Sequence, residues 1–475
     1  MSSEIHYFSS LPLTTFYGNK KKYRLKFQDN LIIWDNAKPP YENKVIPIEN
    51  VIGIESNPNE NNKQFEIHYA KKKANNKWKH KLLALHHSDA YQVSIWVTSL
   101  QICLQQSTKR AANILLFVNP HGGKKTALNV FEKYAKPLFN IAGIDFSVIV
   151  SQRRNQIQDL VINNNFDTYD SLVCVGGDGT ALELINGLVL RECRLHDIDP
   201  HDPNQTLPKP SIPVGIIPGG STDTTAYCIY GTTDATTAVI HIILGDTLGL
   251  DLVSVHDDTN FLKLYAGVLS YGYLGDVAHF SEDLRWMGPA RYEYTGFKKI
   301  MSNAAYEGEI TIMADTSDRN LTKCYENCEE CLSRRHEEAE VVKKIVKGKF
   351  FMVSGANMSC AGERNPHGLA PYSHLGDGYL YLVIIHHTSV IQSIKTLQKF
   401  LSDDYDVQDM PHVEVYRAKE FHFKADSNAL PGRWNCDGEV IHNTEVQARV
   451  HRQLITVFSR GIGRPTTSNK CCFLS

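Results

Sequence analysis

The chain has 475 residues, enough for two or three domains, and its 42% hydrophobic and 21% charged residues are typical of globular proteins. A formal net charge of −2 argues against general attraction to nucleic acid or to an anionic membrane. The 11 cysteines are scattered, many of them in strand-like runs, which indicates reduced thiols rather than a secreted disulfide framework. The N-terminus lacks the features of a signal peptide, and no apolar run approaches the ~18–20 residues that span a bilayer. We therefore expect a cytoplasmic protein with no nucleic-acid partner, whose contacts with membranes are peripheral.

Residues 1–110 alternate short strand-like runs with polar turns and close with one helical segment, 88–106. The strand-like runs are 23–27, 30–34, 50–54, 64–69 and 78–85. Antiparallel strands followed by a tryptophan-containing helix resemble a pleckstrin-homology domain, so we expect this region to place the protein on a membrane. Two lysine triplets, 20–22 and 71–73, either bind phosphoinositide headgroups there or form solvated loops, and both alternatives stay open.

Residues 111–245 have a different pattern of predicted secondary structure, in which continuous apolar strands alternate with helices. The expected strands are 114–118, 146–150, 171–175 and 212–217, and the expected helices are 126–139, 153–164, 180–190 and 223–228. This order predicts an α/β domain with a Rossmann-like, three-layer arrangement around a parallel sheet. Ligands bind such sheets beyond the carboxyl ends of the strands.

Three glycine-rich loops leave these carboxyl ends and predict a nucleotide site. They contain Asn119, Pro120, His121, Gly122 and Gly123 after the first strand, Gly176, Gly177, Asp178 and Gly179 after the third, and Gly219, Gly220 and Ser221 after the fourth. Asp178 is the single acid in the second loop, where a carboxylate beside phosphates is useful if it accepts a proton or holds a metal ion. An ordinary Asp-Gly turn is the alternative. Glu183 either forms a capping box with Thr180 or orders a nucleotide or a Mg²⁺-bound water.

Residues 246–463 return to strand signals with hairpin turns. The expected strands are 251–255, 261–265, 309–313, 350–353, 378–385, 412–416 and 453–458, with a hairpin loop at 257–260. We expect an antiparallel β-sandwich domain packed against the first, with lipid and nucleotide meeting in the cleft between them.

The motifs at 119–123, 176–183 and 218–223 resemble the diacylglycerol kinase and sphingosine kinase superfamily. Later stretches at 271–276, 285–292, 324–331, 357–360, 374–378 and 434–439 are similar to the ceramide kinase family within it. The resemblance extends over residues 113–463. It departs from the superfamily at Ser151, where threonine is usual, and at Pro218-Gly-Gly, where Pro-Ala-Gly is commoner.

This resemblance implies transfer of phosphate from ATP, aided by Mg²⁺, to the primary hydroxyl of ceramide, giving ceramide 1-phosphate. It makes Asp178 the general base and Gly176, Gly177, Gly179 and Asp276 contacts for the lipid. The implied nucleotide contacts are Asn119, Pro120, His121, Gly122, Gly123, Ser151, Glu183, Gly219, Gly220, Ser221, Arg285, Arg291, Asp437, Gly438 and Glu439. Rival readings are a sphingosine or diacylglycerol kinase, an NAD kinase, and a silent lipid-binding scaffold.

Two cysteine patterns add hypotheses of their own. Cys324, Cys328 and Cys331 have the spacing of a metal half-site, with His336 or Cys360 as fourth ligand, or they form a reduced cluster without metal. Residues 464–475 read as a flexible tail in which Cys472 begins a prenylation signal, so we expect a C-terminal lipid anchor.

Overall fold

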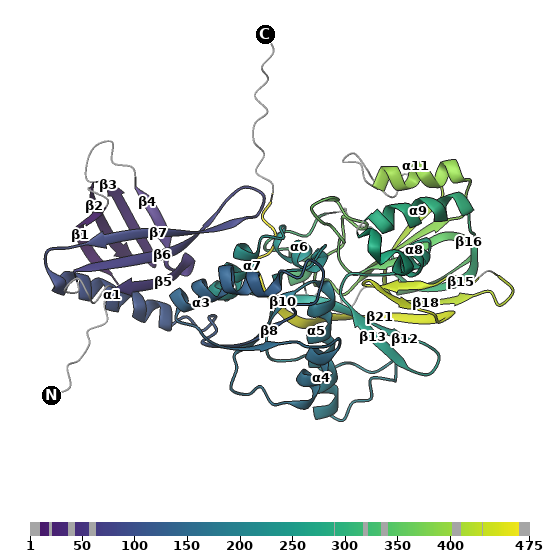
Figure 1. Ribbon diagram of the computed structural model, residues 1–475, viewed down its shortest axis with the longest axis horizontal. Coiled ribbons are helices and arrows are strands. Elements are labelled where there is room, and N and C mark those ends of the chain that lie inside the picture. The colour runs from purple at the N-terminus through teal and green to yellow at the C-terminus, as the bar shows by residue number, and fades with distance from the viewer. Residues whose placement is uncertain are drawn as a thin grey trace, which may run out of the picture.

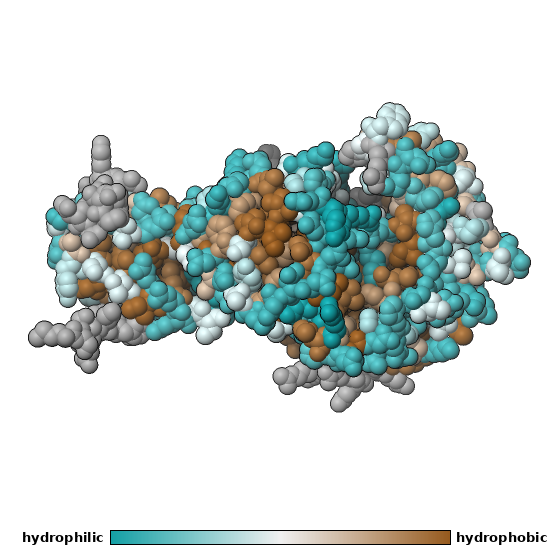
Figure 2. Space-filling view, turned by 60° about the horizontal axis from the view of Figure 1, so that its bottom comes forward, coloured by the Kyte–Doolittle hydropathy of each residue, from teal (hydrophilic) through white to brown (hydrophobic). Residues whose placement is uncertain are grey.

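The computed structural model describes residues 10–18, 21–36, 43–56, 63–288, 290–316, 322–333, 341–400, 410–429 and 431–464. Figure 1 shows a small N-terminal body of strands at one end, followed by a larger body in which helices and strands mix. On the face seen in Figure 2, hydrophilic side chains divide the exposed hydrophobic ones into separate areas. Among the described residues, every helix is too short or too polar to cross a membrane.

The N-terminal body is one antiparallel sheet of seven strands, in the order β4-β3-β2-β1-β7-β6-β5. Its elements are β1 (Leu11–Gly18), β2 (Lys21–Gln28), β3 (Leu31–Asn36), β4 (Lys44–Pro47), the short helix η1 (Ile48–Asn50), β5 (Val51–Ser56), β6 (Gln64–Lys72), β7 (Trp78–His86) and α1 (Ala90–Gln105). Helix α1 buries Trp96 and Leu100 in the core of this sheet. The five strand-like runs and the helix read from the sequence are all present, and β1 and β4 are additional.

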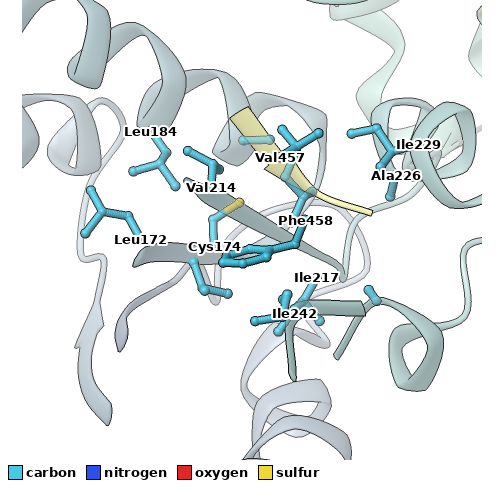
Figure 3. Close-up of a cluster of buried hydrophobic side chains, with 14 of the residues drawn as sticks. Leu172, Cys174, Leu184, Val214, Ile217, Ala226, Ile229, Ile242, Val457 and Phe458 are labelled. Carbon is cyan, nitrogen blue, oxygen red and sulfur yellow. The ribbon is translucent and has the colours of Figure 1, made fainter. Parts of the chain in front are cut away.

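The middle of the chain forms a parallel sheet in the order β9-β8-β10-β11, which confirms the mixed α/β fold. Its strands are β8 (Asn113–Val118), β9 (Asp145–Val150), β10 (Ser171–Gly176) and β11 (Val214–Pro218). Its helical segments are α2 (Ala127–Val130), η3 (Phe131–Ala135), α3 (Lys136–Ala142), α4 (Gln156–Asn163), α5 (Asp178–Leu195), α6 (Thr224–Tyr230) and α7 (Ala235–Leu244). Strands β10 and β11 are buried throughout because helices cover the sheet, and Figure 3 shows side chains from both strands packing together with those of α5, α6 and α7.

The remaining strands run antiparallel to their neighbours within the second half. They are β12 (Thr247–His256), β13 (Phe261–Tyr265), β14 (Val268–Gly272), β15 (Tyr306–Asp315), β16 (Val341–Ala356), β17 (Leu380–His386), β18 (Val413–Ala425), β19 (Trp434–Cys436), β20 (Glu439–Ile441) and β21 (Glu445–Phe458). The helices are α8 (Tyr273–Ser281), η4 (Glu282–Met287), α9 (Ala290–Ser302), α10 (Glu329–Leu332) and α11 (Val390–Phe400). The hairpin loop expected at 257–260 is confirmed, whereas α8, α9 and α11 were not predicted, and in Figure 1 they form a layer over the strands.

Strand β21 connects the parallel half of the large sheet (β8–β11) with its antiparallel half (β12–β21). It pairs antiparallel with β12 and β18 and touches β11 in parallel at Val214 and Val457. One 14-stranded sheet therefore runs through both halves, and Val457 and Phe458 enter the same core as the parallel strands in Figure 3. This connection holds the loops of the parallel half in a set position relative to the second half.

Candidate functional site

The three glycine loops lie against one another at the carboxyl edge of the parallel sheet. The backbone N–H of Gly219 donates to the carbonyl oxygen of Gly176 at 2.9 Å. A Cβ added at Gly220 would lie 2.4 Å from the Cα of Gly177, so this contact between loops requires glycine. Gly123 has φ +49°, and a Cβ there would lie 2.8 Å from the amide nitrogen of Ser221. The loops predicted from three separate stretches therefore form one backbone-lined surface.

The first loop is open to solvent but anchored at its base. The Asn119 side chain donates to the Thr180 hydroxyl at 3.0 Å and accepts from the backbone N–H of His121 at 3.0 Å. His121 and Gly123 are exposed, whereas Pro120 and Gly122 are half-buried. Asn119 therefore orders the loop through protein contacts, and the backbone beyond it is free to face a ligand. After β9, Ser151 is buried, and its N–H donates to Val118 at 2.9 Å.

Asp178 lies where two helices begin. It is the first residue of α5, and its carboxylate accepts hydrogen bonds from the backbone N–H groups of Thr224 at 3.1 Å and Thr225 at 2.8 Å, at the start of α6. Asp178 therefore lies at the N-termini of two helices, and the otherwise unpaired N–H groups of α6 hold and orient its carboxylate. The side chain remains half-buried, between the second and third loops.

A second carboxylate, Asp223, accompanies Asp178, and the sequence analysis did not single it out. It adopts φ 54° before α6 and accepts from the backbone N–H of Gly220 at 2.9 Å. Burial raises the pKa of Asp223 to about 6, and the negative charge of Asp178 adds to this shift. The one signal in the sequence was its position at the end of the Gly-Gly-Ser-Thr-Asp loop. Paired acids of this kind can exchange a proton or share a cation.

Glu183 is not a helix cap, so the capping-box alternative is wrong. Helix α5 begins at Asp178, two residues earlier than the sequence predicted, with Gly177 as N-cap, so Thr180 and Glu183 lie inside the helix. Burial raises the pKa of Glu183, partly opposed by hydrogen bonds from the backbone of Asn155 and Ile157 at the start of α4. Glu183 therefore connects α5 to the loop that follows β9.

Glu439 joins the two halves of the protein beside Glu183. Lys263 on β13 donates to its carboxylate at 2.6 Å, and Arg154, before α4, also pairs with it. Burial opposes ionisation, but Lys263 and Arg154 outweigh it and lower the pKa of Glu439. This cluster places two carboxylates and two cations at the junction of the parallel and antiparallel halves.

The carboxylate of Asp437 is held by backbone N–H groups, whereas that of Glu439 is held by cations. Its two oxygens accept three backbone N–H groups, from Ala266 at 2.9 Å, Gly267 at 3.0 Å and Val268 at 2.7 Å. Asp437 itself has φ 46° and begins the turn, with Gly438, between β19 and β20. The carboxylate of Asp437 is thus engaged in holding the β13–β14 connection, as that of Glu439 is engaged by Lys263 and Arg154.

Asp276, the implied lipid contact, lies on helix α8. It is 2% exposed and accepts from Lys299 at 2.8 Å, Tyr306 at 2.9 Å and Arg433 at 3.2 Å. Phe280 lies beneath both cations, with Lys299 3.9 Å from its ring centroid. Within the described residues, Asp276 therefore organises a buried ion cluster next to the β19–β20 hairpin.

The two predicted phosphate-binding arginines lie in the helical layer of the second half. Arg285 belongs to η4, and its side chain lies outside the described part of the structure. Arg291 on α9 donates to the Tyr292 hydroxyl at 2.6 Å and lies 3.5 Å from Glu282. These contacts keep Arg291 within its own layer, and its part in nucleotide binding stays a prediction.

The cysteine trio acquires a partner that the sequence analysis did not name. Cys328 lies 3.1 Å from Nδ1 of His374, while Sγ of Cys360 donates to the carbonyl oxygen of Met358 at 3.3 Å. Among the described residues, His374 rather than Cys360 lies with the three cysteines. His336 and Cys472 both lie outside the described residues.

Comparison with known proteins identifies the family of this chain. Residues 113–255 match the diacylglycerol kinase catalytic domain, and residues 268–473 match the ceramide kinase C-terminal domain. The chain is 34% identical to the ceramide kinase of Mus musculus over 450 residues, covering 85% of each chain. It is also 34% identical to the ceramide kinase of Homo sapiens over 445 residues, covering 84% of this chain and 83% of the human one. A crystal structure of a diacylglycerol kinase from Bacillus anthracis str. Sterne superposes with a TM-score of 0.48 at 14% identity, covering 74% of this chain and 97% of that one. The protein belongs to the ceramide kinase family.

Proposed function

We propose that this protein is a ceramide kinase, which transfers the γ-phosphoryl group of ATP to the primary hydroxyl of ceramide. The observation that carries the proposal is the carboxylate of Asp178, held by the amides of Thr224 and Thr225 where three glycine loops meet. Its support in sequence is 34% identity to curated ceramide kinases across 85% of the chain.

The nucleotide phosphates fit the surface formed by the three loops. Backbone N–H groups of glycine loops and helix N-termini bind phosphate oxygens, and exposed Lys124 adds a positive charge beside them. The neighbouring carboxylates of Asp178 and Asp223 are the hard oxygen donors that Mg²⁺ prefers, so the residues present suit that ion. When bound, Mg²⁺ neutralises charge on the phosphates.

The chemical step needs one base and a fixed alignment. Asp178 accepts the proton as the O–H bond of the lipid hydroxyl breaks, a new O–P bond forms to the γ-phosphorus, and ADP leaves with the bridging oxygen. The amides of Thr224 and Thr225 orient the carboxylate before it accepts that proton. The nucleotide is positioned by the first glycine loop together with Ser151 and Glu183. At the junction of the two halves, Glu439 is held by Arg154 and Lys263.

The lipid reaches the site across the helical layer of the second half. Trp286 is 81% exposed on η4, Phe297 64% on α9 and Ile391 68% on α11. Exposed apolar side chains of this size mark a surface that contacts a partner or a lipid. Lys298 is exposed on α9 and Lys395 on α11. Exposed lysines beside apolar side chains are typical of helices that lie at an anionic membrane interface. We assign this layer to the bilayer from which ceramide is taken.

The N-terminal sheet with its C-terminal helix supports a pleckstrin-homology-like targeting role. Lys21, the first residue of β2, is exposed, whereas Lys72 pairs with Glu326 at 2.8 Å. The first lysine triplet is therefore the better phosphoinositide contact. Binding of the full chain to vesicles with and without phosphoinositides, compared between wild type and Lys21→Ala/Lys22→Ala, tests it. Equal binding of the two proteins would remove this role.

The substrate assay decides between the kinase readings. Labelled ATP is offered with ceramide, sphingosine, diacylglycerol or NAD, and the labelled product is separated and identified. We expect ceramide 1-phosphate as the main product. Preferential phosphorylation of sphingosine or diacylglycerol would show that the protein is a sphingosine kinase or a diacylglycerol kinase instead. Absence of turnover with every acceptor would indicate a lipid-binding scaffold.

A further inference from the structure

Three cysteines and one histidine lie together, away from the glycine loops. The ligand atoms of Cys324, Cys328, Cys331 and His374 all lie within 4.8 Å of one another. The cysteines are half-buried and His374 is 4% exposed. The histidine comes from a loop 43 residues beyond the last cysteine, so the fold rather than the sequence completes the set.

The separations agree with a shared metal ion better than with a disulfide. Sulfurs that each lie about 2.3 Å from a tetrahedral zinc are about 3.8 Å apart. The Sγ atoms of Cys324 and Cys331 are 3.8 Å apart, far beyond the ~2.05 Å of an S–S bond. Sγ of Cys328 and Nδ1 of His374 are 3.1 Å apart, somewhat closer than the same geometry gives.

Local structure orients two of the cysteines. Asn327 adopts φ 56° and turns the chain, after which Cys328 caps α10 and Cys331 lies within it. Residues three apart on a helical turn face the same way, so both sulfurs point to one centre.

The histidine is held in place from the other side. Asp251 donates its backbone N–H to the carbonyl oxygen of Leu375 at 2.7 Å, and its carboxylate accepts from Gly378 at 2.6 Å. These bonds fix the loop that carries His374 to β12, on the shared sheet. The site therefore connects the segment between β15 and β16, which carries the cysteines, to strand β12 of the 14-stranded sheet.

The cysteine segment also touches other parts of the chain. Gln453 on β21 donates to the carbonyl oxygen of Cys331 at 2.8 Å, and Arg452 donates to the same oxygen at 3.4 Å. Glu326 accepts from Lys72 of the N-terminal sheet at 2.8 Å. Arg452 and Gln453 therefore hold the backbone at Cys331 against β21, and Glu326 links the segment to the N-terminal sheet.

We propose that Cys324, Cys328, Cys331 and His374 bind one Zn²⁺ tetrahedrally. Soft thiolates with one imidazole select zinc, and four protein ligands leave no open position, so the ion stabilises structure and takes no part in catalysis. The three cysteines bind as thiolates and release their protons to solvent. The ion fastens the 322–333 segment, which Glu326 ties to Lys72 of β6, to the loop of His374 and so to β12.

The first experiment measures metal in the full chain purified without chelators. We expect about one zinc per chain by elemental analysis. Cobalt added after zinc removal should give the sulfur-to-cobalt charge-transfer and visible bands of a tetrahedral thiolate site. Substoichiometric metal in folded protein, or a Cys324–Cys331 disulfide found by mass spectrometry, overturns the proposal.

Variants then assign the ligands. Cys328→Ser and His374→Ala should lose most of the zinc, whereas His374→Cys should retain it, because a fourth thiolate also completes the site. Cys103→Ser, in α1 of the N-terminal domain, serves as the matched control with full zinc content. Full zinc in His374→Ala removes that residue from the site. Should Cys328→Ser fail to fold, the metal content and cobalt spectrum of the wild type still decide, and neither depends on kinase turnover.

Discussion

The carboxylates of the parallel and antiparallel halves differ in how many partners hold them. Asp178 and Asp223 lie at the ends of parallel strands, where backbone amides bind them and their loops stay open to a ligand. Asp276 and Asp437 in the antiparallel half have their oxygens engaged by cations, a tyrosine and backbone N–H groups. Asp178, Asp276 and Asp437 were singled out in sequence motifs, whereas Asp223 was not. Their partners, rather than their motifs, separate an acid suited to chemistry from one that holds the fold.

Removing the charge of Asp178 should produce the largest effect on activity. Asp178→Asn keeps an oxygen acceptor for the α6 amides but cannot take the hydroxyl proton, so we expect kcat to fall about 10²–10⁴-fold with an almost unchanged melting temperature. ATP-dependent ceramide phosphorylation and thermal unfolding measure the two quantities. Retention of more than a tenth of the wild-type rate would show that another group is the base.

Asp276→Ala should produce the largest effect on stability. The change leaves Lys299 and Arg433 without their buried partner, which costs about 3–5 kcal/mol of unfolding free energy. Denaturant unfolding measures it, with Asp283→Ala, exposed on η4, as the control expected to change little. A midpoint equal to that of wild type would mean that Asp276 is free to bind the lipid headgroup instead.

Asp437→Ala should destabilise the protein somewhat less. It leaves the N–H groups of Ala266, Gly267 and Val268 without their acceptor, at about 1 kcal/mol for each part-buried group and so about 3 kcal/mol in total. Comparison with Asp437→Asn, which keeps one acceptor oxygen, tests the cause. If Asp437→Asn unfolds like wild type but no longer binds ATP, the residue belongs to the nucleotide site after all.

Asp223 should give stability a distinctive dependence on pH. Its pKa is about 6 in the folded protein, above the usual value, so the folded state binds the proton more tightly than the unfolded chain. Stability should therefore fall as pH rises from about 4 to 6, by about 2 kcal/mol, and then level off.

Asp223→Asn provides the test of this slope, because the amide still accepts from Gly220 but has no charge to bury. Unfolding measured between pH 4 and 7 should show the fall in wild type and a flatter curve in the variant. Parallel curves would contradict the assignment of the slope to Asp223.

The glycine loops could be predicted because their signal is local. Each follows an apolar strand directly, and parallel strands bring their carboxyl ends to one edge, so Gly123, Gly177 and Gly220 had to meet. The surroundings of Asp276 and His374 could not, because Arg433 and Cys328 are far away in the chain. Helix α9 was missed for a related reason, since its exposed Phe297 and Met301 do not mark a face packed on the core.

By itself, the sequence determined the alternation of strands and helices, the glycine loops with Asp178 among them, and the family. These follow from backbone preferences and short-range spacing, which depend on neighbours along the chain. Only the tertiary structure decided which acids are saturated, that Glu183 reaches α4 instead of capping its own helix, and that His374 joins the three cysteines. Burial and charge pairing act between residues brought together from distant positions, so their outcome depends on the assembled sheet.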